Sequence, residues 1–107
     1  MTILEALRSG VSNYPFDDLS IEAIAVERGL SISEEFTTAV ATTRPYQLAK
    51  ADCIRYVLSM VNLQQGGAAV SQTDIRTKIA LANAIYRRYR EPLIADPDLH
   101  NATITVL

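Results

Sequence analysis

The stretch TTRPYQLAKADCIRYVLSMVNL, residues 42–63, carries the clearest helical pattern of this 107-residue chain. Pro45 suits the first turn of a helix, where its missing N–H leaves no hydrogen bond unmade. At about 100° per residue, the polar side chains fall on one narrow strip. These residues are Asp52, Arg55, Ser59 and Asn62. The wide apolar arc around them holds Ala49, Cys53, Tyr56, Val57, Met60 and Val61. An arc of this width predicts a central helix that is buried on several sides, with Cys53 as a small core residue.

A second strong helix is predicted downstream, from Asp74 to Arg90. Its inner stripe recurs at helical spacing. The stripe is Ile75, Ile79, Ala82, Tyr86 and Tyr89. Tyr56 is expected to face Ile79 across the two helices. Pro92 ends the pattern, because the residue before a proline is biased away from helical geometry.

The linker NLQQGGAAVSQTD, residues 62–74, begins like a glycine-rich phosphate loop. A nucleotide-binding P-loop needs a preceding strand and a lysine directly after the glycines, whereas here a helix precedes the glycines and the next lysine is Lys78. Gly66 or Gly67 instead suits the left-handed end of the central helix. Ser71 or Thr73 suits the N-cap of the next helix. The linker is therefore interpreted as the turn of a helical hairpin.

The first forty residues predict shorter helices. Thr2 and Glu5 form a capping-box pattern before a helix from Ile3 to Ser12. A second helix is predicted over 18–28, with Gly29 directly after its end, where a positive φ is easy for glycine.

The segment LSISEEFTTAVATT, residues 30–43, is interpreted as a short helix over 34–41. Either Ser31 with Glu34, or Ser33 alone, would cap it. Its threonines weaken the helix, because β-branched side chains lose rotamer freedom there.

The expected fold is a single all-α domain over residues 1–107. It is a small bundle of four to five helices with a central buried helix, a C-terminal helical hairpin and an extended C-terminal tail over 92–107. The end of the tail, ATITVL, alternates as a strand would. Because an isolated strand is not stable alone, it is expected to need a partner, which another subunit would supply.

Charge is divided along the chain into three segments. Residues 1–43 carry −5, residues 44–90 carry +6 and residues 91–107 carry −3, within a net charge of −2. Opposite segments can meet within one chain or between copies, or can simply be solvated faces of different sign. One basic group is a candidate interaction site, and its members are Arg76, Arg87, Arg88 and Arg90. It would contact phosphates or a partner's carboxylates, or would serve only as a solvated helix end favoured by the helix dipole.

Residue types that usually carry catalysis do not gather in the sequence. His100, the single histidine, has no second histidine or cysteine at metal-ligand spacing. The one cysteine cannot form an internal disulfide, which favours an intracellular protein. The sequence shows no secretory signal and no apolar run that would span a membrane. We therefore expect no enzymatic activity, no cofactor and no metal.

The second half of the chain resembles the head–tail connector (head-completion adaptor) proteins of tailed phages and prophages. The resemblance covers about residues 46–92 and rests on an "LAxAD"-like stretch, a glycine turn and an "ANxIYxxY"-like helix end. The matching residues are Leu48, Ala49, Ala51, Asp52, Gly66, Gly67, Ala82, Asn83, Ile85, Tyr86 and Tyr89.

This resemblance implies a structural virion protein. Its subunits would form a ring beneath the portal, around the DNA exit channel. Its partners would be other copies of itself, the portal and tail-completion proteins, and passing DNA without sequence specificity. It would occur in the virion, and in the host cytoplasm during assembly. The alternative is a small helical nucleic-acid-binding or protein-interaction module of a mobile element. The overall acidity and the lack of a helix-turn-helix signature count against nucleic-acid binding.

Overall fold

The computed structural model describes residues 1–11, 14, 16–63 and 72–94, and for 60–63 and 72–74 it describes the backbone only. Within these ranges the chain forms five helices and no strand. They are α1 (Ile3–Ser9), α2 (Asp18–Glu27), α3 (Thr38–Ala41), α4 (Arg44–Leu63) and α5 (Gln72–Arg88). The prediction of an all-α bundle is confirmed.

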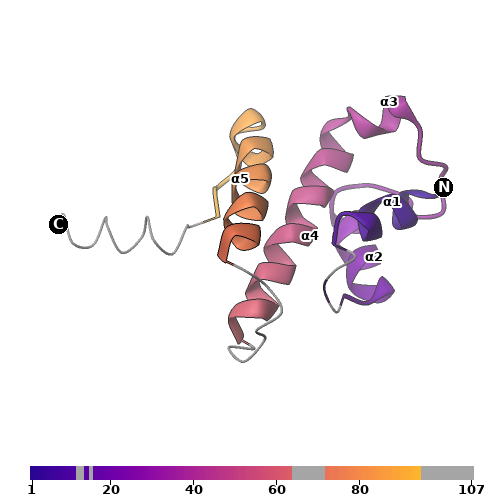
Figure 1. The fold of residues 1–107 in the computed structure, drawn as a ribbon. Coiled ribbons are helices and arrows are strands. Elements are labelled where there is room, and N and C mark those ends of the chain that lie inside the picture. Colours follow the sequence, from indigo (N-terminus) through magenta and orange to yellow (C-terminus); the bar gives the residue numbers. More distant parts are fainter. Residues whose placement is uncertain (12–13, 15, 64–71, 95–107) are drawn as a thin grey trace.

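The long helix α4 forms the centre of the bundle. It crosses the middle of the molecule, with α5 on one side and α1 and α2 on the other (Figure 1), and it contacts α1, α2, α3 and α5. Its buried residues are Tyr46, Leu48, Ala49, Ala51, Cys53, Ile54, Val57 and Leu58. Full burial of one large aliphatic side chain contributes about 1.5–3 kcal/mol, so α4 supplies much of the core. The prediction of a central buried helix is confirmed, as is the core position of Cys53.

The partner of α4 in the C-terminal half is α5. Of the predicted inner stripe, Ile79, Ala82 and Tyr86 are buried, and Ile75 and Tyr89 are partly buried against the core. Ile85 is also buried, at 9% exposure. The turn predicted at Gly66 and Gly67 and the cap at Ser71 lie outside the described residues. The alternative cap, Thr73, was wrong, because α5 already begins at Gln72.

The orientation predicted for Tyr56 was wrong. Its ring packs edge-on against Phe16, with centroids 5.0 Å apart, and 42% of the residue remains exposed. The position lies only about 40° around α4 from Asp52 at 100° per residue. It therefore borders the polar strip on the side of α2, and Ile79 packs without it.

The N-terminus of α1 follows the predicted capping box. The Thr2 N–H donates to Glu5 Oε1 at 2.7 Å, and the Glu5 N–H donates to Thr2 Oγ1 at 3.2 Å. The helix ends at Ser9, three residues earlier than predicted, with Gly10 as its C-cap. Lys78 of α5 donates to the Gly10 carbonyl at 3.1 Å, and a cation at a helix C-terminus is favourable.

The segment between α2 and α4 corrects a second prediction. A helix was expected over 34–41, but α3 begins at Thr38 and is capped by Thr37. Residues 32–36 instead run beside the start of α1, where the N–H groups of Ile3 and Leu4 donate to the Glu34 and Ile32 carbonyls at 2.9 and 3.2 Å. The first N–H groups of a helix have no partner within it. Carbonyls within residues 32–36 supply these partners, and the bonds outweigh the weak tendency of residues 34–37 to form a helix.

Candidate functional site

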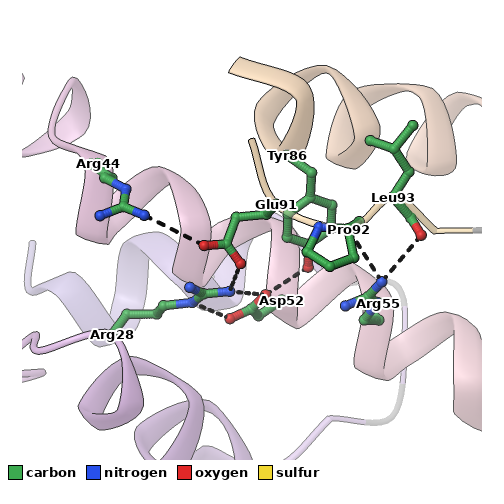
Figure 2. A network of polar contacts seen from close by, with 8 residues as sticks. All are labelled: Arg28, Arg44, Asp52, Arg55, Tyr86, Glu91, Pro92 and Leu93. Carbon is green, nitrogen blue, oxygen red and sulfur yellow. Dashed lines mark hydrogen bonds and ion pairs between the residues drawn. The ribbon is translucent and has the colours of Figure 1, made fainter. Parts of the chain in front are cut away.

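The most connected polar group of the described chain centres on Asp52 of α4. Arg28, the C-cap of α2, donates to both of its oxygens, from Nε to Oδ2 at 2.6 Å and from Nη2 to Oδ1 at 3.1 Å. The Tyr86 hydroxyl of α5 donates to Oδ1 at 2.6 Å. Figure 2 shows the three side chains converging from three helices. Asp52 thus links α2, α4 and α5 through one carboxylate.

Glu91 extends the group beyond the end of α5. Its carboxylate pairs with Arg28 at 3.5 Å and with Arg44, at the start of α4, at 3.4 Å. The side chains of Arg28, Asp52 and Glu91 are 23%, 18% and 25% exposed. In this partly buried group, each charge lies beside one of opposite sign. The attraction between them offsets the cost of removing them from water, which a single buried charge would bear alone.

Two similar helix endings bring these side chains together. At the end of α2, Leu30 N donates to Ala25 O and Gly29 N to Val26 O, with Gly29 at φ 84°. At the end of α5, the same bonds run from Glu91 N to Tyr86 O and from Arg90 N to Arg87 O, with Arg90 at φ 58°. Both are Schellman endings.

The second ending turns the chain so that Glu91 faces α2 and α4. The cost is one arginine in the left-handed region, where a residue with a Cβ is strained. The sequence predicted the ending at Gly29, but no glycine marks the ending at Arg90.

The segment after α5 is fastened to the bundle at three further points. Arg55 Nη2 donates to the carbonyls of Pro92 and Leu93 at 3.4 and 3.3 Å, and its guanidinium lies 5.0 Å from the Tyr86 ring centre. Asn83 makes two hydrogen bonds to the backbone of Ile94. Asn83 Nδ2 donates to the Ile94 carbonyl at 2.9 Å, and the Ile94 N–H donates to Asn83 Oδ1 at 2.7 Å.

The Asn83 amide thereby bonds both the N–H and the carbonyl of Ile94, as the backbone of a neighbouring strand would. We call Arg28, Asp52, Tyr86 and Glu91, together with Arg55 and Asn83, the clamp. It holds residues 91–94 in place. The rest of the predicted tail, with ATITVL and His100, lies outside the described residues.

The protonation equilibria follow from these contacts. The hydrogen bond to Asp52 raises the pKa of Arg28. Burial, and then the hydrogen bond to Asp52, raise the pKa of Tyr86 above its ordinary value. Burial raises the pKa of Cys53 to about 12, so the thiol is held protonated at neutral pH. The clamp is therefore charged at Arg28 and neutral at Tyr86 over the physiological range.

An open depression of about 430 Å³ lies beside the clamp, between α2 and α4. Arg28, Asp52 and Arg55 line it together with Tyr56 and Ser59. These three charged groups already have partners within the chain, and Glu27 is the fourth charged residue of the lining. The arrangement is suited to fixing the relative positions of α2, α4, α5 and residues 91–94.

The four arginines predicted as an interaction site do not form one cluster. Arg87, Arg88 and Arg90 gather at the end of α5, and all three are exposed. Arg76 lies about 16 Å away along the helix axis, at 1.5 Å per residue. Arg88 turns toward α4, where it donates to Gln47 at 3.4 Å.

The contacts of the clamp were not predicted, although four of its six residues were singled out from the sequence. Asp52 and Arg55 were placed on the polar strip of the central helix, and Asn83 and Tyr86 belong to the motif of the resemblance. Arg28 and Glu91 were not singled out. The signal available for Arg28 was its position directly before Gly29, the residue predicted to follow the end of a helix. The signal for Glu91 was its position directly before Pro92, which ends the helical pattern.

In the described ranges, no group of three or more His, Cys, Asp or Glu side chains is placed to hold a metal ion. None of the helices there is long and apolar enough to cross a membrane.

In a comparison with known proteins, the chain matches the model of a family of unknown function, DUF6706, over residues 1–105. Neither the curated proteins nor the solved structures contain a match. The family model covers the helices, the clamp and most of the segment that follows them. The chain therefore belongs to the DUF6706 family.

Proposed function

We propose that this protein is a structural subunit of the head–tail connector of a tailed phage or prophage. Its copies assemble as a ring beneath the portal, around the DNA exit channel, and it has no catalytic role. The portal and the tail-completion proteins are its neighbours in the assembled particle.

The proposal is supported by the positions in the fold of the residues that carry the resemblance to connector proteins. The apolar and small motif residues are in the core, with Leu48, Ala49 and Ala51 at 0–2% exposure and Ala82 at 0%. Buried in this way, they belong to the common core that α4 and α5 share with the other helices.

The polar motif residues also act within the fold. Asp52 and Tyr86 bond to each other across α4 and α5. Asn83 holds the backbone of Ile94. The motif therefore encodes a rigid helical pair with a fixed exit for the C-terminal segment. A rigid pair of this kind suits a structural subunit that holds its neighbours in fixed positions rather than an enzyme.

A gene deletion in an inducible prophage that carries the gene tests the proposal. We expect induced cells to accumulate heads and free tails that remain unjoined, as counted by electron microscopy, and a plasmid copy to restore joined particles. Normal joined particles after deletion would contradict the connector role. A gene that lies outside any cluster encoding a portal protein would contradict it independently.

The exposed Arg87, Arg88 and Arg90 favour a second candidate, a nucleic-acid-binding module. Each phosphate contact contributes about −0.9 to the slope of log affinity against log salt concentration. A module of this kind would bind duplex DNA with a slope near −3 if all three arginines act, and replacing them with alanine would abolish it. Fluorescence anisotropy with a labelled duplex separates this candidate from the connector.

A further inference from the structure

The outer face of α2 carries an exposed apolar stripe. Ile21 and Ala25 are buried at 0% exposure on the inner face, whereas Leu19 and Val26 are 76% and 60% exposed. Leu19, Ala23 and Val26 follow the spacing i, i+4, i+7, which puts them on one side of a helix. A helix that is apolar on both sides is usually covered on both.

Acidic residues border this stripe, and basic residues are absent from α2. Its sequence, DLSIEAIAVE, contains Asp18, Glu22 and Glu27 and no lysine or arginine. Asp18 is paired with Arg8 of α1. Glu22 lies within the exposed face, between Leu19 and Val26. The outer face of α2 is therefore both apolar and acidic, and we call it the α2 stripe.

A groove with complementary character lies on another part of the molecule. It is open, has a volume of about 350 Å³, and lies between the start of α4, the end of α3 and the second half of α5. Tyr46 and Ile85 form its floor, and Phe36 and Leu81 line its sides. The Phe36 and Tyr46 rings are 5.0 Å apart, and Leu81 is 41% exposed.

The charges at this groove are positive. Lys50 and Arg88 line it, and none of its described lining residues is acidic. We call it the α4–α5 groove. Its apolar floor and basic rim match the apolar centre and acidic border of the α2 stripe.

The two surfaces of one copy cannot meet each other. α2 and α5 lie on opposite sides of α4 (Figure 1), and they make no direct contact. Residues 91–94 do not cover the groove either. Ile94 is held at Asn83, which lies about 160° around α5 from Ile85 at 100° per residue.

We propose that the α2 stripe of one copy docks into the α4–α5 groove of the next copy, an inference that rests on the proposed function. Leu19, Ala23 and Val26 would be the apolar anchors, as in other helix-in-groove contacts. Glu22 would approach Lys50 and Arg88. Since each copy has one stripe and one groove on different faces, the contact is head-to-tail and repeats into a ring or a filament.

One helix face in one groove is a small contact. Interfaces below about 1,200 Å² of total buried area are usually weak and transient. Association of the isolated protein should therefore depend on concentration. Closure of a ring strengthens it, because the last contact forms within the assembly.

Two variants that each destroy one surface test the contact. Val26→Asp places a charge in the stripe, and Leu81→Asp places one in the groove. Leu93→Asp is the matched control, because the Leu93 side chain is 46% exposed, close to the 41% of Leu81, and belongs to neither surface. All three must keep the helical circular dichroism and the melting temperature of the native protein.

The readout is sedimentation equilibrium over a wide range of protein concentration. The native protein and Leu93→Asp should self-associate alike, and each surface variant alone should associate at least tenfold more weakly. A mixture of Val26→Asp with Leu81→Asp should form a one-to-one heterodimer that does not grow, because the intact groove of the first accepts the intact stripe of the second.

Three results in solution would each overturn the inference. The native protein could stay monomeric at every concentration, or the mixture could associate no better than its components. Removal of residues 95–107 could abolish association that both surface variants retain, which would assign the groove to that segment.

The prophage assay keeps the two proposals apart. Full restoration of joined particles by Val26→Asp refutes this contact alone, whereas normal particles without the gene refute the connector role.

Discussion

Replacing Asp52 with alanine removes the acceptor that joins three helices. The Arg28 guanidinium loses two hydrogen bonds, of 2.6 and 3.1 Å, and the Tyr86 hydroxyl loses one of 2.6 Å. A hydrogen bond to a charged group contributes about 1.5–3 kcal/mol. If the bonds from Arg28 count as one interaction and the bond from Tyr86 as another, their loss lowers the free energy of unfolding by about 3–6 kcal/mol.

Two features reduce that figure. Water reaches part of the Arg28 side chain, which is 23% exposed, and Glu91 remains 3.5 Å from it as a second partner. We therefore expect Asp52→Ala to lower the free energy of unfolding by about 3 kcal/mol, at the lower end of the range. Domains of this size have about 5–15 kcal/mol in total. The melting temperature should fall by about 12–24 °C at roughly 4–8 °C per kcal/mol.

Urea unfolding followed by circular dichroism measures the loss. Asp18→Ala is the matched control, because Asp18 pairs with Arg8 where the two side chains are about half exposed, at 53% and 49%. It should cost about 1 kcal/mol or less. Tyr86→Phe combined with Asp52→Ala should cost less than the two separate changes, since both remove the same bond. A loss under about 0.5 kcal/mol for Asp52→Ala, or strict additivity, would refute the clamp as a source of stability.

Three further changes examine other parts of the fold. Ile79→Ala should cost about 2–5 kcal/mol in urea unfolding because the residue is buried, and a loss under about 0.5 kcal/mol would argue against the packing of α5 on α4. The raised pKa values of Cys53 (to about 12) and Tyr86 contribute stability that is present below their ordinary pKa values and lost as pH rises through the folded ones. Unfolding free energies should therefore fall from about pH 9 upward, and less steeply for Cys53→Ala; equal slopes would disprove the contribution of the thiol. Arg90→Gly should raise the melting temperature, with a gain of about 1 kcal/mol from relief of its left-handed backbone, whereas a lower melting temperature would exclude strain at this residue.

Features within a few residues of one another were predictable from the sequence. The capping box of Thr2 and Glu5, the helix end at Gly29 and the position of Pro45 near the start of α4 each follow from hydrogen bonds or dihedral angles spanning at most five residues. Periodicity likewise identified α4 as the buried helix, because its apolar arc is wider than one neighbour can cover.

Partners far apart in the chain were decided by the tertiary structure. Arg28 and Tyr86 stand 24 and 34 residues from Asp52, and their contact depends on how α2 and α5 are rotated against α4. The late start of α3 has a similar origin, because backbone groups of residues 32–36 bond to the first residues of the chain, from Met1 to Leu4.

Tyr56 shows the physical reason most directly. The pattern of α4 indicates which of its positions are apolar, but it does not say which neighbouring helix faces each part of the arc. Packing determines that choice, since side chains of several helices must fill a common space at nearly crystalline density. The sequence by itself thus determined most of the helices and the helix ends marked by the capping box and by Gly29. The packing of those helices decided where Tyr56 points, which charges meet at Asp52 and which faces of α2 and α5 remain open.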